Sequence, residues 1–282
     1  MKNTMNREDK QDEKYMRLAL ELAAKGLGRT SPNPCVGAVI VKNNKIIGKG
    51  GHEKCGLPHA EANALNSVTE NARGATIYVS LEPCSHLNKL TPPCTQAIIS
   101  AGIRRVVIAM LDPNPQVNGV EELRKHGMVV KTGVLEKEAV ELNKAFTKAI
   151  TTSLPYVLVK TAMSADGKIA CNSDVSHGLS SPEFLELVHK LRNEYDCILV
   201  GIGTVLQDDP RLTCRMKNGR DPLRVILDSL LRIPLNARVL ADNNVLIACT
   251  TQANKRKKKI LEKKGVLVKE FGKKQVNLRQ LL

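Results

Sequence analysis

Apolar and polar residues alternate along the first half of the chain with two periods, one typical of helices and one typical of strands. Residues 8–25 carry apolar side chains at helical spacing, and Gly26 supplies a stop. Short apolar runs bounded by turn residues predict strands, at 36–41, 45–50, 76–81, 105–110 and 128–134. Helical patterns lie between them, at 59–68, 95–102 and 121–127. Because Asn43 and Asn44 separate the first two strands, these strands are expected to form a hairpin.

A long amphipathic stretch closes this first region. Residues 135–150 keep helical spacing throughout, which predicts one continuous helix. Pro155 then precedes a fresh apolar run, so the domain boundary is expected at 151–154. The second half repeats the alternation around a helix at 181–194, with strands predicted at 156–162, 197–203, 223–228 and 245–249. We therefore expect two α/β domains, 1–150 and 155–282.

Length and composition agree with this division. A chain of 282 residues has room for about two domains, and its 42% hydrophobic content with 2% aromatic residues predicts aliphatic cores. No apolar run reaches the roughly 18 residues of a membrane span. The polar first 16 residues do not have the pattern of a secretory signal. Eight cysteines in such a chain favour thiols or metal ligands over disulfides, so we expect a soluble, cytoplasmic protein.

The net charge of +15 is concentrated near the end of the sequence. Residues 255–274 hold ten Lys and Arg against two Glu, which accounts for +8 of it. Such a run can bind nucleic acid or a phosphate-bearing partner. A solvated lysine-rich surface is the simpler interpretation, because a chain without Trp and with three Phe and four Tyr offers little for base stacking.

The motifs HAEANAL and LEPCSHLNKLTPPC contain the residue types of a zinc site. His59 and Glu61 begin a predicted helix, Cys84 follows a predicted strand, and Cys94 opens the next helix. Strand ends and helix starts at one edge of an α/β sheet are where ligand sites form. One histidine and two thiolates would leave the fourth zinc position open for water, as in catalytic sites.

Glu61 is then the expected proton carrier between that water and a leaving amine. A closed structural zinc site would need a fourth ligand. Cys35, Cys55 and His52 are available for it, but none stands in a C-x-x-C pair. Because H-x-E followed by P-C and a second cysteine is the arrangement of zinc-dependent nucleobase deaminases, a catalytic site is the favoured interpretation.

The cysteine spacing narrows the class of deaminase. Nine residues separate Cys84 from Cys94, whereas cytidine and nucleic-acid deaminases use C-x-x-C. With its H-A-E helix, L-E-P-C-S-H and T-P-P-C, the chain resembles the bifunctional riboflavin-biosynthesis deaminase/reductase family. Further matching motifs follow in order through both halves: SPNPCVGAVIV (31–41), GHEKCGLPHAE (51–61), DPNPQV (112–117), KTAMSADGKIA (160–170), LVGIGTVLQDDPRLTCR (199–215) and RVILDS (224–229).

This resemblance implies a cytidine-deaminase-like α/β/α domain followed by a dihydrofolate-reductase-like α/β domain. In that family the first half removes the 2-amino group of 2,5-diamino-6-ribosylamino-4(3H)-pyrimidinone 5′-phosphate. The second half uses NADPH to reduce the ribosyl group to ribityl. The implied cofactors are zinc and NADPH. The implied partner is a small pyrimidine ribosyl phosphate, with neither nucleic acid nor a membrane.

By position, the resemblance also implies roles for individual residues. Zinc would be bound by His59, Cys84 and Cys94, with Glu61 as the proton shuttle. Substrate would be bound by Asn33, His52, Ser176, Arg192, Leu212 and Arg215. NADPH would be bound by Ala162, Thr204, Asp208 and Ser229. Without the resemblance, Asn33 would be interpreted as a turn residue, His52 as a surface histidine and Arg192 as a solvated charge.

The chain also departs from the family pattern. Between the cysteines, LNKL replaces a shorter glycine-containing loop, and Lys89 there is a candidate phosphate contact. Gly178 stands where the family has Trp, and the family continues past the position of Leu282 with a glycine-rich loop and closing strands. We therefore expect an incomplete reductase domain with little activity by itself. Two kinds of partner are candidates: further copies of this chain in a homo-oligomer, or a separate chain that supplies the missing end of the reductase domain.

Three other interpretations stay open. One is a deaminase with a vestigial reductase domain. Another is a tRNA or other polynucleotide deaminase, which the basic charge favours and which the cysteine spacing and the second domain argue against. The third is a non-enzymatic chain that decays after truncation and holds zinc without turnover.

Overall fold

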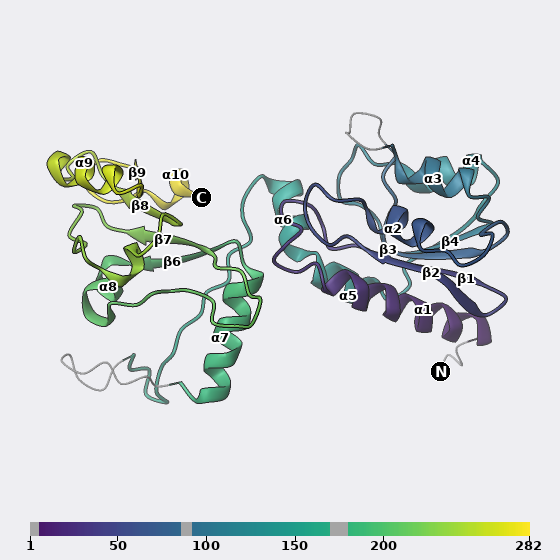
Figure 1. Ribbon diagram of the computed structural model, residues 1–282, viewed down its shortest axis with the longest axis horizontal. Coiled ribbons are helices and arrows are strands. Elements are labelled where there is room, and N and C mark those ends of the chain that lie inside the picture. Colours follow the sequence, from purple (N-terminus) through teal and green to yellow (C-terminus); the bar gives the residue numbers. More distant parts are fainter. Residues whose placement is uncertain (1–5, 86–91, 170–179) are drawn as a thin grey trace. The chain divides into compact units, whose positions relative to one another are not determined.

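The computed structural model describes residues 6–85, 92–169 and 180–282. The chain divides into two compact units, Met1–Tyr156 and Val157–Leu282, each with its own sheet (Figure 1). Both units combine helices with strands, which confirms the α/β class expected from the sequence. Within the described ranges, no helix is long and apolar enough to cross a membrane.

The first unit contains a five-stranded sheet in the order β2-β1-β3-β4-β5. β1 (Gly37–Lys42) and β2 (Lys45–Gly51) form the predicted antiparallel hairpin. Asn43 and Asn44, at φ 48° and 63°, adopt the left-handed conformation that a two-residue hairpin turn requires.

The remaining strands form the parallel part of the sheet. β3 (Thr76–Leu81) pairs antiparallel with β1 and parallel with β4 (Arg105–Met110), which pairs parallel with β5 (Val129–Thr132). Their carboxyl ends therefore lie at one edge, the edge at which open α/β sheets bind ligands.

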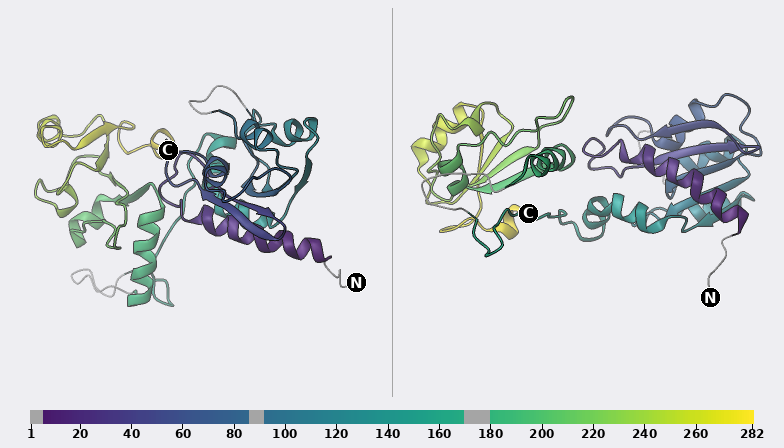
Figure 2. Two further views of the ribbon diagram at one scale, coloured as in Figure 1. Left: turned by 45° about the vertical axis from the view of Figure 1, so that its right-hand side comes forward. Right: turned by 90° about the horizontal axis from the view of Figure 1, so that it is seen from below.

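Helices cover both faces of this sheet (Figures 1 and 2). α1 (Arg7–Ala24) and α5 (Glu136–Leu142) pack on one face. The other face carries α2 (Ala60–Asn66), α3 (Cys94–Ser100) and α4 (Gly119–Lys125). The result is the three-layered α/β/α arrangement that the family resemblance implies.

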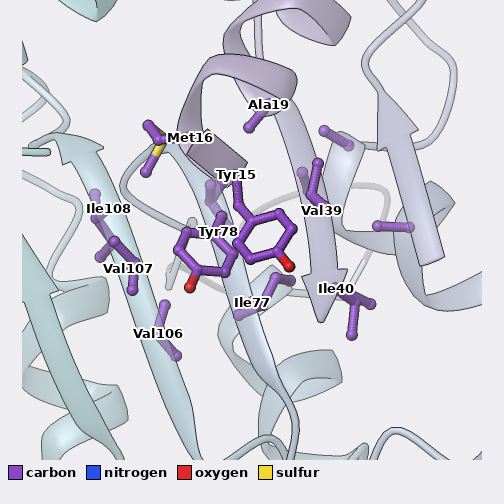
Figure 3. Close-up of a cluster of buried hydrophobic side chains, with 14 of the residues drawn as sticks. Tyr15, Met16, Ala19, Val39, Ile40, Ile77, Tyr78, Val106, Val107 and Ile108 are labelled. Atoms are coloured by element: carbon purple, nitrogen blue, oxygen red, sulfur yellow. The ribbon is translucent and has the colours of Figure 1, made fainter. Parts of the chain in front are cut away.

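The core between α1 and the sheet is mainly aliphatic, as the composition predicts, and is shown in Figure 3. Tyr15 and Tyr78 are its aromatic members, with ring centroids 5.2 Å apart. α1 lies so close to β1 that a Cβ at Gly37 would stand 1.9 Å from the carbonyl oxygen of Ala19. Only glycine allows this approach.

A buried carboxylate ties α1 to the sheet. Asp12, 1% exposed, accepts hydrogen bonds from Arg105 at 2.7 and 2.8 Å, from Lys131 at 2.8 Å and from the hydroxyl of Tyr78 at 3.0 Å. Burial by itself would raise the pKa of Asp12. The bonds from the two cations and the hydroxyl outweigh burial and hold that pKa below its ordinary value.

The single helix predicted over 135–150 is wrong, because the structure has two helices there. α5 ends at Leu142 and α6 (Lys144–Thr152) begins after Asn143. Asn143 is buried, and its side chain accepts from the backbone N–H of Cys35 at 2.8 Å and donates to the Cys35 carbonyl at 3.0 Å. The break thus places Asn143 against a segment 108 residues away, which no local pattern could indicate.

The second unit contains a four-stranded parallel sheet in the order β6-β7-β8-β9. Its strands are β6 (Cys197–Gly201), β7 (Leu223–Leu227), β8 (Val245–Cys249) and β9 (Leu267–Glu270). The first three fall within predicted runs. β9 lies in the lysine-rich segment, for which no strand was predicted.

The connections of this unit are mostly helical. α7 (Pro182–Glu194) matches the predicted helix, and its Ser181 cap accepts from the backbone N–H of Phe184. The others are α8 (Ile202–Asp208), the 3-10 helix η1 (Arg238–Leu240), α9 (Lys255–Lys263) and α10 (Leu278–Leu281). In the lysine-rich run, Leu261 anchors α9 in the core and most of the charged side chains are exposed.

The strand predicted at 156–162 is also wrong for this structure. These residues form no ladder with any described strand, and Val159 is 79% exposed. An alternating apolar pattern favours a strand, but the ladder exists only where a neighbouring strand offers its backbone groups.

Candidate active site

Three of the predicted zinc ligands come together in the first unit. His59 immediately precedes α2, Cys84 follows β3, and Cys94 is the first residue of α3. The histidine comes from the helix after the hairpin and the cysteines from the carboxyl side of the parallel strands. The fold therefore gathers at one edge residues that are up to 35 positions apart.

The distances between these ligand atoms fit a zinc ion. His59 Nδ1 lies 3.3 Å from Cys94 Sγ and 3.7 Å from Cys84 Sγ, and all three atoms lie within 4.8 Å of one another. Tetrahedral zinc, with bonds of about 2.3 Å to sulfur and about 2.0 Å to nitrogen, separates its ligand atoms by about 3.5–3.8 Å. The N/S/S donor set also suits zinc.

The charges at the site favour a bound cation as well. Cys84 Sγ accepts the backbone N–H of Cys94 at 3.4 Å, which favours a thiolate. The hydrogen bond with Cys84, together with burial and the carboxyl group of Glu61, raises the pKa of the Cys94 thiol well above its ordinary value. Two thiolates and a carboxylate cannot all be ionised so close together unless a cation neutralises them.

Glu61 lies in the first turn of α2, two residues after His59, and is 3% exposed. Burial raises the pKa of Glu61 to about 7; the charge of Cys84 acts in the same direction, and His59 and Cys94 act against it. A carboxyl group with that pKa exchanges a proton readily near neutral pH, which suits a general acid and base.

His52 and Asn33 form a second polar pair beside the cluster. His52 is buried, and its ring packs edge to face on the ring of His59 at 5.5 Å. Because His52 Nδ1 lies 3.1 Å from the carbonyl oxygen of Pro58, it must carry the proton. Nε2 then accepts from Asn33 Nδ2 at 3.2 Å. The surface position expected for His52 from its sequence context alone is thus wrong.

Glu82 and Ser85 hold the chain on either side of Cys84 in place, a role that no sequence pattern indicates. The Glu82 carboxylate accepts from the backbone N–H groups of Asp112 at 3.2 Å and Val120 at 2.9 Å. Ser85 Oγ accepts from Asn118 N at 2.9 Å. The chain around Cys84 is therefore fixed to the loop that follows β4 and to the start of α4. Both residues belong to the LEPCSH motif, but their partners lie at least 30 positions away.

In the second unit, the structure brings together part of the predicted substrate set. Arg192 of α7 donates from Nη1 to the carbonyl of Thr213 at 3.0 Å, next to buried Leu212. Burial lowers the pKa of Arg192. The charge of Arg215, two residues after Thr213, is close enough to lower that pKa further. Ser176 lies outside the described residues, as do Lys89 and Gly178.

The predicted NADPH residues are more dispersed. Thr204 lies in α8 directly after β6, and Ser229 follows β7, so both are at the carboxyl edge of neighbouring parallel strands. Asp208 ends α8, and Ala162 lies in a stretch without regular structure. Within the described part of the chain, no hydrogen bond or ion pair joins any two of these four residues.

Comparison with known proteins matches both units. Residues 9–110 match the cytidine and deoxycytidylate deaminase zinc-binding region, and residues 155–282 match the RibD C-terminal domain. The riboflavin biosynthesis protein RibD of Aquifex aeolicus is 49% identical over 260 residues, which cover 91% of this chain and 73% of the relative.

Two solved structures agree with this assignment. A deaminase/reductase crystal structure from Thermotoga maritima is 41% identical, with a TM-score of 0.82, covering 94% of this chain and 82% of its own. Acinetobacter baumannii RibD, form 1, is 40% identical, with a TM-score of 0.86, covering 97% and 76%.

The relatives are longer than this chain. Across eight RibD relatives, the chain spans from 60% to 80% of the relative's length. The matches nevertheless run through both units, in the order zinc-binding deaminase region and then RibD C-terminal domain. The chain therefore belongs to the RibD family of riboflavin biosynthesis, with a zinc-binding deaminase domain followed by a reductase domain.

Proposed function

We propose that the first unit hydrolyses the 2-amino group of 2,5-diamino-6-ribosylamino-4(3H)-pyrimidinone 5′-phosphate. Water adds to the ring carbon, the C–N bond breaks, and the products are the ring carbonyl and ammonia. The observation that carries this proposal is the His59, Cys84 and Cys94 cluster with buried Glu61 beside it. Three zinc ligands leave the fourth position for water, and the carboxyl group of Glu61 can transfer the protons of that water.

His59 Nδ1 and the two thiolates would hold the zinc ion. When bound there, zinc supplies a Lewis acid that lowers the pKa of water from about 15.7 to near 7. Glu61 then takes a proton from the attacking water and delivers it to the departing nitrogen. Burial raises the pKa of Glu61 above its ordinary value, which supports its role as a carrier of protons between the water and the leaving nitrogen.

Asn33 and His52 are proposed to position the pyrimidine. His52 Nε2 accepts a hydrogen bond from Asn33 Nδ2, which fixes the orientation of the Asn33 amide group. The amide oxygen is then left to accept an N–H of the ring, which distinguishes a pyrimidine edge from an apolar surface. In this proposal His52 acts mainly through Asn33, because both of its ring nitrogens already have partners.

For the second unit, we propose NADPH-dependent reduction of the ribosyl group. Ala162, Thr204, Asp208 and Ser229 would contact NADPH. Ser176, Arg192, Leu212 and Arg215 would contact the substrate. The meeting of Arg192 and Arg215 supports a phosphate site, since guanidinium groups bind phosphate oxygens with paired hydrogen bonds.

The deaminase proposal is tested with Glu61→Gln. The variant should keep its zinc, because Glu61 is not a ligand, and should release ammonia from the pyrimidinone phosphate about 10²–10⁴-fold more slowly. Glu53→Gln, the same change at an exposed position nearby, is the matched control and should turn over at the parent rate. Parent-like ammonia release by Glu61→Gln would contradict the role given to Glu61.

A further inference from the structure

Two arginines in the second unit stand close together without carboxylate partners. Among the described residues, neither Arg192 nor Arg215 forms an ion pair. Arg192 is held by one bond from Nη1 to Thr213, and its Nε is buried without a hydrogen-bond partner in the described part of the chain. A buried donor without a partner next to a second cation is an arrangement that an anion would complete.

A third basic side chain fixes this arrangement. His189 lies one turn before Arg192 on α7, and its Nδ1 is 3.3 Å from the backbone N–H of Arg215. Because an amide N–H can only donate, Nδ1 must accept and the ring proton must be on Nε2. The His189 carbonyl also accepts from Cys214 Sγ at 3.5 Å. α7 therefore holds Cys214 by its side chain and Arg215 by its backbone N–H.

Burial and the charges around His189 lower its pKa and so favour the neutral ring. Burial lowers the pKa of His189, and the charges of Arg192 and Arg215 lower it further, while the Thr213 carbonyl acts in the opposite direction. The carboxylate of Asp221 accepts from the backbone N–H of Cys214 at 2.7 Å, and its charge acts on Arg192. Near neutral pH, the acceptor at Nδ1 is therefore available to Arg215.

We propose that His189 is a positioning residue that holds Arg215 beside Arg192, so that the two guanidinium groups bind the phosphate monoester of the reductase substrate. This inference rests on the substrate role proposed above for the two arginines. His189 acts through the backbone of Arg215 and not through contact with the phosphate.

Lowering the pH distinguishes a positioning role of His189 from direct contact between His189 and the phosphate. If a protonated His189 bound the anion, a lower pH would tighten binding because a positive charge is gained. If His189 positions Arg215, protonation of Nδ1 removes the acceptor, the Arg215 N–H loses its partner, and binding weakens. The two roles therefore predict opposite signs.

The test follows the Arg192 Nε–H resonance of the ¹⁵N-labelled full chain. Titration with ribose 5-phosphate should shift that resonance in the parent. In His189→Leu, which removes the acceptor, affinity should fall about fivefold, the equivalent of one net hydrogen bond. His189→Asn, whose Oδ1 lies near the position of Nδ1, should restore most of it. Unchanged spectra elsewhere in the second unit show that the variants are folded.

The pH arm uses sulfate, which stays a dianion while the histidine titrates. Parent affinity should fall below the pKa of His189, and His189→Asn should lose this dependence. Parent-like affinity in His189→Leu, or tighter binding at low pH, would overturn the positioning role. If the Arg192 Nε–H resonance did not shift when ribose 5-phosphate was added, the substrate role of both arginines would be overturned as well. Ammonia release by the first unit would be unaffected.

Discussion

Replacement of Asp12 by Asn removes the charge of a carboxylate that is 1% exposed and that accepts four hydrogen bonds. Breaking a buried ion pair costs about 3–5 kcal/mol when the partner cation is left buried. Here Arg105 and Lys131 are 18% and 34% exposed and keep Glu8 at 3.0 Å and Asp9 at 2.7 Å. Since the cations retain water and partners, we expect Asp12→Asn to lower the free energy of unfolding by about 2–3 kcal/mol.

The loss should depend on pH in a defined direction. The pKa of Asp12 is lowered in the folded chain, so its contribution is fully present above the unfolded value of about 3.9. As the pH falls through the folded pKa, the carboxyl group becomes protonated and the contribution disappears. The difference between parent and Asp12→Asn should therefore be constant from about pH 5 upward and shrink below about pH 4.

Amide hydrogen exchange in β4 measures this free energy in the full chain, because Val106, Val107 and Ile108 are fully buried and report opening of the first unit. Asp9→Asn is the matched control. Asp9 is 47% exposed and, among the described residues, pairs with Lys131 alone, so its loss should cost about 0.2–1 kcal/mol. Equal exchange rates in the two variants, or a difference that grows toward low pH, would refute the reasoning.

Two further predictions concern the metal site and the break between α5 and α6. Cys94→Ala should lower the zinc content of the purified chain, measured by metal analysis, well below that of the parent. The control Cys55→Ala, at an exposed cysteine, should keep the parent's zinc content. Equal zinc in all three proteins would show that Cys94 is not a ligand. Asn143→Ala leaves the buried backbone N–H and C=O of Cys35 without partners, so hydrogen exchange in β1 should show that the free energy of unfolding falls by about 2–4 kcal/mol. The control Asn66→Ala, at an exposed position, should change it little. A parent-like result for Asn143→Ala would mean that this contact adds no stability.

Much of the fold follows from local pattern. The α1 helix, the Asn43–Asn44 hairpin and the strands at 76–81 and 105–110 match the structure within about one residue, because each buries one face or both against the same core and its periodicity records that burial. The residues of the proposed zinc site can also be picked out from the sequence. His59, Glu61 and Cys84 stand in short motifs in which residue type and spacing reflect the chemistry.

Other features depend on contacts between distant segments. The break at Asn143 exists because Cys35 needs partners for its backbone, and the strand expected at 156–162 is absent because a ladder needs a neighbour. The bond from Lys131 to Asp12, the bond from Asn33 to His52 and the bond from Arg215 to His189 likewise join residues 19 to 119 positions apart. Periodicity reports which face of an element is buried but not which group lies opposite, so pairings of polar groups are determined only when the chain packs.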